Sequence, residues 1–384
     1  MFPLPGRAGN HGAVTPPQNV VELLQALIRI PSVNPEGDPG TPHTGEQRIA
    51  EWLAGWLRAE FPNARIELRD VEPGRPNVVA RFADSDGKKP RILLAPHTDT
   101  VSVGGMTIDP FGAEVREGRV WGRGATDTKG TMAAMLWALR EIRERIPSLG
   151  RELWFAGLCS EEAGQHGALA LAKEERFDFV IAGEPTGLDA VIAHKGPLWL
   201  TLTTRGHAVH AAAPGLGDNA IYKMADALRC IRDELAPALA ALSHPLLGAT
   251  TISAGTVNGG IKTNIVPDTC RAEVDIRTVP GEDPLDRVTA ALRRASPGIE
   301  ITHICAPPML TNESHPVIAS LKNHGSRCVG APWFSDAAVF ARNGVPAIAL
   351  GPGSIAQAHT RDEWIAIADL EKGAQFFTRF LSGL

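Results

Sequence analysis

Short apolar segments alternate with amphipathic helical segments along this chain, and that alternation limits its possible folds more than any other feature. Apolar runs at 77–82, 91–96 and 152–158 have the length and composition of buried strands. Before the first run, at 45–61, and between the last two, at 131–146, apolar residues recur with the period of a helix. Strands that alternate with helices are typical of an open sheet with helices on both faces. The sequence therefore predicts an α/β fold with a doubly wound, mostly parallel sheet.

The pattern changes near Gly196, where a strand begins to alternate apolar and polar residues instead of being apolar throughout. We read 198–214 as one such strand, and the order that follows is helix, strand, strand, helix, strand, as in a ferredoxin-like unit. After residue 306 the earlier α/β pattern returns. Because 384 residues exceed one simple core, we expect two domains. The larger is discontinuous, 1–194 with 307–384, and the inserted α+β domain spans 195–306.

Composition excludes several classes of protein. With 43% hydrophobic and 21% charged residues and a net charge of −5, the chain has no sign of binding nucleic acid or a membrane surface. Its start is rich in Pro and Gly, which predicts a loose tail rather than a secretory signal. The five cysteines form no CxxC pair, which favours reduced thiols in a cytoplasm: Cys159, Cys230, Cys270, Cys305 and Cys328.

Side chains that can bind a metal ion or move a proton recur where predicted strands end. Because binding sites in open α/β sheets form beyond the carboxyl ends of the strands, these side chains should meet at one edge. Each alone has an ordinary explanation; Asp127, for example, could simply cap the helix that follows it. Independent structural roles would not place them all at the same kind of position: His97, Asp99, Asp127, Glu161, Glu162, Glu184 and His359.

Imidazole and carboxylate ligands without cysteine suit zinc or a similar divalent cation, cobalt and manganese included. Asp127, Glu162 and Glu184 carry three negative charges, so one divalent ion leaves a deficit. Two ions with a bridging hydroxide balance the charge, which predicts a two-metal site. Glu161 is then free to act as general base, and Asp99 to orient the ring of His97.

Several motifs together resemble the co-catalytic zinc amidohydrolases, the family of acetylornithine deacetylase, succinyldiaminopimelate desuccinylase, aminoacylase and glutamate carboxypeptidase. They run in order from about residue 20 to the C-terminus: "HTDT", "GRGATDTKG", "SEEAG", "GEPTGL", "GHAVHAAAP", "TNIVPD" and "GPGSIAQAHTRDEW". The resemblance implies a catalytic domain with an inserted lid and dimerisation domain.

The resemblance also implies a role for each residue that matches a family motif. His97, Asp127 and Glu184 would hold one zinc, and Asp127, Glu162 and His359 the other, with a cis peptide after Asp127. Glu161 matches the general base, and His210 matches a histidine that stabilises the oxyanion in the partner subunit's site. The remaining matches concern the substrate: Asn264 and Arg277 would bind its carboxylate, and Gly351 and Gly353 would line the pocket.

The function implied is hydrolysis of the amide of an N-acylated amino acid by a homodimer, on the acetylornithine deacetylase-like branch. A dipeptidase or carboxypeptidase with the same chemistry is the main alternative, and a desuccinylase is another. A binding protein that lost turnover conflicts with the intact set of ligands and base. A serine hydrolase lacks its G-x-S-x-G elbow, and "GRGATD" is only a weak phosphate-binding pattern.

Overall fold

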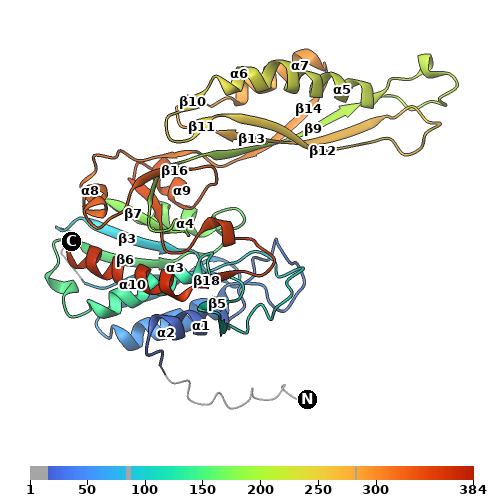
Figure 1. Cartoon of the computed structure of the whole chain (residues 1–384). Helices are drawn as coiled ribbons and strands as arrows, with labels where there is room; N and C mark the ends of the chain where they lie inside the picture. The colour runs from blue at the N-terminus through green and yellow to red at the C-terminus, as the bar shows by residue number, and fades with distance from the viewer. Residues whose placement is uncertain (1–15, 84–87, 282) are drawn as a thin grey trace, which may run out of the picture.

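A computed structural model describes residues 16–83, 88–281 and 283–384 (Figure 1). The tail expected at the N-terminus lies almost wholly outside these residues. Two main sheets lie apart from each other, and the termini of the described chain belong to the body that contains the larger one. None of the helices in the described ranges has the length and apolarity needed to span a bilayer.

The larger sheet has nine strands within the described residues, in the order β1-β2-β6-β3-β7-β17-β8-β15, with β16 beside β8. Its centre, β6-β3-β7-β17, is parallel, which confirms the predicted α/β fold with a mostly parallel central sheet, whereas its outer pairs include antiparallel ones. The strands are β1 (Arg65–Glu72), β2 (Arg75–Arg81), β3 (Arg91–Pro96), β6 (Glu152–Gly157), β7 (Phe179–Gly183), β8 (Ala190–His194), β15 (Met309–Leu310), β16 (Cys328–Ala331) and β17 (Ala347–Leu350).

Helices cover both faces of this sheet because its strands are apolar on both sides. Leu94 of β3 packs in one core and its neighbour Leu93 in the other, as the alternation of side chains along a strand requires. The first core is closed by α1 (Val20–Ile28), α2 (Gln47–Glu60), α3 (Lys129–Glu141), α8 (Pro316–Asn323) and α10 (Ile367–Ser382). The second is closed by α4 (His166–Glu174) and α9 (Ala337–Arg342).

The second main sheet is antiparallel, in the order β12-β13-β9-β14. Its strands are β9 (Gly196–Arg205), β12 (Thr251–Gly259), β13 (Thr269–Thr278) and β14 (Glu300–Cys305), with a small hairpin of β10 (Ser243–His244) and β11 (Gly248–Ala249). Helices α5 (Ala220–Cys230), α6 (Ala236–Ala240) and α7 (Leu285–Ala295) lie on one face (Figure 1). Their apolar side chains form a separate core with those of the sheet.

The strand that we expected over 198–214 is shorter than predicted. It ends at Arg205, and the backbone at the next residue, Gly206, packs closely against Asp218. A Cβ on Gly206 would lie 1.9 Å from the carbonyl oxygen of Asp218, so glycine is required for this close approach. His207 and Asp218 then exchange two backbone hydrogen bonds. His210 therefore lies on a loop rather than on the strand.

The two main sheets are joined by two crossings of the chain that lie side by side. The first passes from β8 to β9 through Lys195, and the second follows β14 through Ala306. The N–H of Ala306 donates to the carbonyl oxygen of Pro197 at 3.0 Å. A Cβ on Gly196 would lie 2.5 Å from both the oxygen of Ala306 and the nitrogen of Pro308, so glycine is required for this close approach.

A three-stranded sheet, absent from our prediction, lies beside α3. It consists of β18 (Trp364–Ala366), β5 (Arg119–Trp121) and β4 (Glu114–Arg116), all antiparallel. Cationic side chains stack on its two tryptophans, with the guanidinium of Arg119 3.9 Å from the Trp364 ring centre. This sheet brings the segment after His359 against the turn that precedes α3.

Candidate active site

The five expected metal ligands meet at the carboxyl edge of the larger sheet. Each follows the carboxyl end of a different strand, except Asp127, which lies in the turn before α3: His97 after β3, Glu162 after β6, Glu184 after β7 and His359 after β17. Two sets of potential ligand atoms lie within 4.8 Å of one another, His97 with Asp127 and Glu162, and His97 with Glu161 and Glu184. The predicted convergence at one sheet edge is therefore present.

Asp127 lies between the two imidazoles. Its Oδ1 is 3.1 Å from Nε2 of His97, and its Oδ2 is 3.3 Å from Nε2 of His359. The same nitrogen of His359 lies 3.1 Å from Oε2 of Glu162. One carboxylate that presents a separate oxygen to each half of a cluster has the geometry of a bridging ligand. The peptide bond between Asp127 and Thr128 is cis, as predicted.

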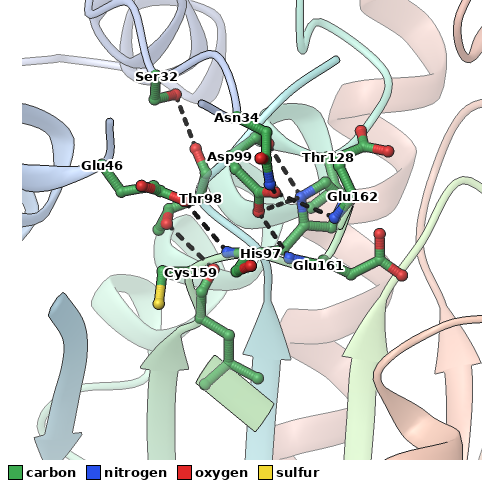
Figure 2. Close-up of polar contacts among 12 residues, drawn as sticks. Ser32, Asn34, Glu46, His97, Thr98, Asp99, Thr128, Cys159, Glu161 and Glu162 are labelled. Atoms are coloured by element: carbon green, nitrogen blue, oxygen red, sulfur yellow. Dashed lines mark hydrogen bonds and ion pairs between the residues drawn. The ribbon is translucent and has the colours of Figure 1, made fainter. Parts of the chain in front are cut away.

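Asp99 is fully buried and holds three parts of the site in place (Figure 2). Its two carboxylate oxygens accept the backbone N–H groups of Glu161 and Glu162, each at 3.0 Å, and Oδ2 also accepts from Asn34 at 2.8 Å. Nδ1 of His97 lies 3.0 Å from the Asp99 carbonyl oxygen and 3.5 Å from its Oδ1. A proton on Nδ1 leaves the lone pair of Nε2 free for a metal ion.

The imidazoles and Asp127 favour opposite charges. Burial disfavours a charge on His97, but its bonds to Asp127 and Asp99 raise its pKa well above the ordinary value. Bonds to Asp127 and Glu162 raise the pKa of His359 to about 10. Burial also disfavours the Asp127 carboxylate, yet His359 and His97 hold its pKa well below the usual range. A metal ion must therefore displace protons from both imidazoles.

The three glutamates, unlike Asp127, have pKa values above the usual range. Burial is the largest cause that raises the pKa of Glu162 to about 7, and the charge of Asp127 adds to it. Burial raises the pKa values of Glu161 and Glu184 well above the usual range, helped by the charge of Glu184 and of Asp127 respectively. So many buried carboxylates close to one another resist ionisation unless cations lie among them.

The residues present fit divalent metal ions. Oε1 of Glu162 is buried and has no hydrogen-bond partner in the described part of the chain, although a carboxylate oxygen can accept two. Two imidazoles and three carboxylates without a thiolate match the ligands that zinc and related ions accept. A cation would satisfy the unpartnered oxygen and the excess of negative charge together.

Three of the predicted functional residues lie away from this cluster, on the body of the second sheet. His210 and Asn264 are exposed. The residue after His210, Ala211, donates its backbone N–H to the carbonyl oxygen of Asn264 at 3.0 Å, so the two segments lie side by side. Nε of Arg277 donates to Oδ2 of Asp275 at 3.0 Å. Among the described residues, no hydrogen bond or ion pair joins His210, Asn264 or Arg277 to the cluster.

Gly351 and Gly353 lie beside the cluster, in the loop after β17. A Cβ on Gly351 would come within 2.3 Å of the Thr131 hydroxyl and 2.6 Å of the Glu184 carbonyl oxygen, so only glycine lets the loop approach Glu184. Gly353 has a φ of +82°, which favours glycine, and accepts the N–H of Gly187 at 2.8 Å. Gly351 therefore packs against Glu184, and Gly353 packs against Gly187, three residues further along the chain.

Two buried acids near the cluster were absent from our prediction. Asp336 precedes α9; its Oδ1 accepts a hydrogen bond from Gln165 at 3.4 Å, its Oδ2 has no partner in the described residues, and burial raises its pKa to about 7. Glu363 follows His359 by four residues and accepts hydrogen bonds from the turn that contains Asp127. Each is a single acid in a segment without periodicity, and only the closeness of Glu363 to His359 hinted at a role.

Comparison with known proteins identifies the family. Residues 93–383 match the model of peptidase family M20/M25/M40, which is more than half of the chain. The chain belongs to this family. It is 32% identical over 371 residues to acetylornithine deacetylase of Proteus mirabilis, covering 91% of this chain and 93% of that protein. It is likewise 32% identical to acetylornithine deacetylase of Yersinia pseudotuberculosis, covering 91% and 94%.

Solved structures of M20 proteins share the fold. An M20 family metallo-carboxypeptidase from Sulfolobus solfataricus superposes with a TM-score of 0.77 at 21% identity, covering 95% of this chain and 99% of that one. A dinuclear metal binding peptidase of the M20 family from Bacillus subtilis superposes with a TM-score of 0.68 at 15% identity, covering 94% and 96%. The predicted family and the predicted class of enzyme, a hydrolase related to acetylornithine deacetylases, are thus confirmed.

Proposed function

We propose that this M20 hydrolase cleaves the amide bond of N-acylated amino acids and releases a carboxylate and a free amino acid. The observation that carries the proposal is the convergence of His97, Asp127, Glu162, Glu184 and His359 at one sheet edge, with Glu161 beside them. The names of the curated relatives, acetylornithine deacetylases, favour an N-acyl amino acid as substrate.

Two divalent ions, zinc before cobalt or manganese, would be held by these five side chains. His97, Asp127 and Glu184 would bind one, and Asp127, Glu162 and His359 the other. When bound, such ions polarise the amide carbonyl and lower the pKa of water. The two oxygens of Asp127 already face different imidazoles, which supports its role as the shared ligand.

Glu161 would move the proton. Its carboxylate is buried beside the cluster, where burial and the charge of Glu184 raise its pKa. A raised pKa makes the ionised carboxylate a stronger base. A base of this kind accepts a proton from the attacking water at a carboxylate oxygen and gives it to the nitrogen of the leaving amine. Asp99 would hold the backbone of this base in place, since its carboxylate accepts a hydrogen bond from the Glu161 N–H.

Residues 195–306 would form a ferredoxin-like lid and dimerisation domain, and residues 1–194 with 307–384 the catalytic domain. Arg277 and Asn264 would bind the substrate's carboxylate, because a guanidinium binds carboxylates with two parallel hydrogen bonds.

The edge strand β12 leaves Val257 53% exposed, and Ile261 after it is 89% exposed, which supports contact with a second chain. All five cysteines are free thiols, which supports a cytoplasmic location.

His210 would stabilise the oxyanion in the partner subunit's site. We expect His210→Ala to lower the maximal rate by about 10²-fold or more, since one lost oxyanion donor has an effect of that size, while metal content stays unchanged. Mixing this variant with inactive Glu161→Gln should restore part of the activity once subunits exchange. No recovery despite exchange, measured with differently tagged chains, would contradict action across a dimer.

The substrate class is tested by metal analysis together with a hydrolysis panel. N-acetyl, N-succinyl and other N-acyl amino acids are compared with dipeptides at equal concentration, with zinc content measured on the same sample. We expect the highest kcat/KM on an N-acyl amino acid. Preference for dipeptides would instead support a peptidase, which is what two M20 proteins of the same fold are named.

A further inference from the structure

We propose that Glu363 is a positioning residue that ties the carboxylate of Asp127 to the loop that carries His359. The inference rests on the two-metal function proposed above, and it concerns how this chain holds two ligands of one ion at the correct separation. Among the described residues, Glu363 makes no hydrogen bond or ion pair with the side chains of the five proposed ligands; it acts through the backbone of Asp127.

The carboxylate of Glu363 is fully buried and makes four hydrogen bonds to one turn. Oε1 accepts the N–H groups of Thr126 at 2.8 Å and Asp127 at 2.9 Å. Oε2 accepts the N–H of Gly124 at 3.0 Å and Nη1 of Arg123 at 2.9 Å. Four donors match the accepting capacity of an ionised carboxylate, and the Arg123 guanidinium balances its charge.

The glycine-rich turn "GRGATD" is shaped to hold this anion. Successive backbone N–H groups that point into one concavity form an anion-binding nest, and such turns need residues with positive φ. Gly124 has a φ of +82°, and a Cβ on Gly122 would lie 2.6 Å from the side chain of Ile28. The anion in this nest is a side chain of the same protein, which explains why a phosphate-like pattern occurs in a hydrolase.

Further bonds join the same two segments. The carbonyl oxygen of Glu363 accepts the Gly122 N–H at 3.0 Å, and that of Trp364 accepts the Thr126 hydroxyl at 2.7 Å. Strand β18, which begins at Trp364, then pairs with β5 just before the turn. Segments 122–127 and 359–364 are therefore held against each other by these bonds. They supply Asp127 and His359, two of the three ligands proposed for one ion.

A buried carboxylate could instead serve stability alone, and Glu152 provides the matched comparison. Glu152 is also buried, and it accepts from Nε of Arg81 at 2.9 Å and from the indole of Trp154 at 2.8 Å. It begins β6, at the end of the sheet opposite the cluster. Glu152→Gln thus removes a buried charge of similar surroundings without touching a ligand segment.

The test compares zinc binding in the full-length wild type, Glu363→Gln and Glu152→Gln. Each protein is stripped with a chelator, checked for native circular dichroism, and titrated with zinc against a chromophoric competitor. We expect the wild type to bind two zinc ions. Glu363→Gln should bind one of them roughly 10–100-fold more weakly, because replacing a residue that supports a metal ligand typically lowers metal affinity by that factor. Glu152→Gln should lower the melting temperature but keep wild-type zinc affinity.

Wild-type affinity for both ions in folded Glu363→Gln would overturn the positioning role while leaving the proposed function intact. Should that variant fail to fold, Glu363→Asp keeps the charge but shortens the side chain, so its oxygens no longer reach the N–H groups of Thr126 and Asp127 in the same geometry; weaker zinc binding there supports the role, and unchanged binding overturns it. A wild type that binds no zinc would contradict the proposed function itself, and this inference with it.

Discussion

Replacement of Glu161 by Gln should lower kcat by about 100-fold or more while both metal ions remain bound, because an amide cannot accept the proton of the attacking water. The two side chains have nearly the same volume, and the Glu161 N–H bond to Asp99 does not involve the changed group. The measurement is steady-state hydrolysis of an N-acetyl amino acid, with zinc counted by elemental analysis on the same preparation.

The neighbouring Glu162→Gln is the matched control for this experiment. Oε2 of Glu162 lies 3.1 Å from His359, so this variant should lose one zinc ion, whereas Glu161→Gln should keep both. Ligand atoms of Glu161, His97 and Glu184 also lie within 4.8 Å of one another, so these three residues could share a metal ion. Loss of a zinc ion from Glu161→Gln would therefore reassign Glu161 as a ligand, and an unaltered rate would remove it from catalysis.

Replacement of Asp127 by Ala should have the largest effect of any single change, because this carboxylate faces both imidazoles. We expect both metal ions to be lost and the rate to fall by at least about 10³-fold, since the ions supply the nucleophile and the electrophilic assistance together. Zinc content and residual hydrolysis at saturating zinc are the measurements.

Asp178→Asn controls for the loss of an aspartate from the same sheet. Asp178 lies at the opposite end of β7, where Oδ2 accepts the Arg91 N–H at 2.8 Å, so its replacement should leave zinc content and rate unchanged. If Asp127→Ala retains one tightly bound zinc, the carboxylate is a ligand of a single ion and the bridging role is wrong.

The sequence predicted the positions of the site residues correctly where they follow a strongly apolar strand. The apolar runs before His97, Glu161 and Glu184 are β3, β6 and β7, and their order in a parallel centre explains why these residues meet. Such runs can only be buried in a sheet with both faces covered, so the position of a residue directly after one of them is nearly fixed.

Short and irregular segments were less predictable. Strands of three residues, such as β4, β5 and β18, have too few positions for a period to show, so their sheet was missed. Asp336 and Glu363 were missed because their function depends on partners far away in the chain, such as the turn before Asp127, 236 residues from Glu363. The separation of Arg277 from the cluster depends on how two bodies are oriented, which no local pattern encodes.

The paired crossings between the sheets determine how those bodies can move. A single strand would let the outer body swing in any direction, but two crossings bonded through Ala306 and Pro197, and pressed together at Gly196, form a flat ribbon. A ribbon bends easily about one axis and resists bending about the other. We therefore expect Arg277 and Asn264 to move together along one arc. The two crossings would then set the path by which these residues approach the proposed metal ligands.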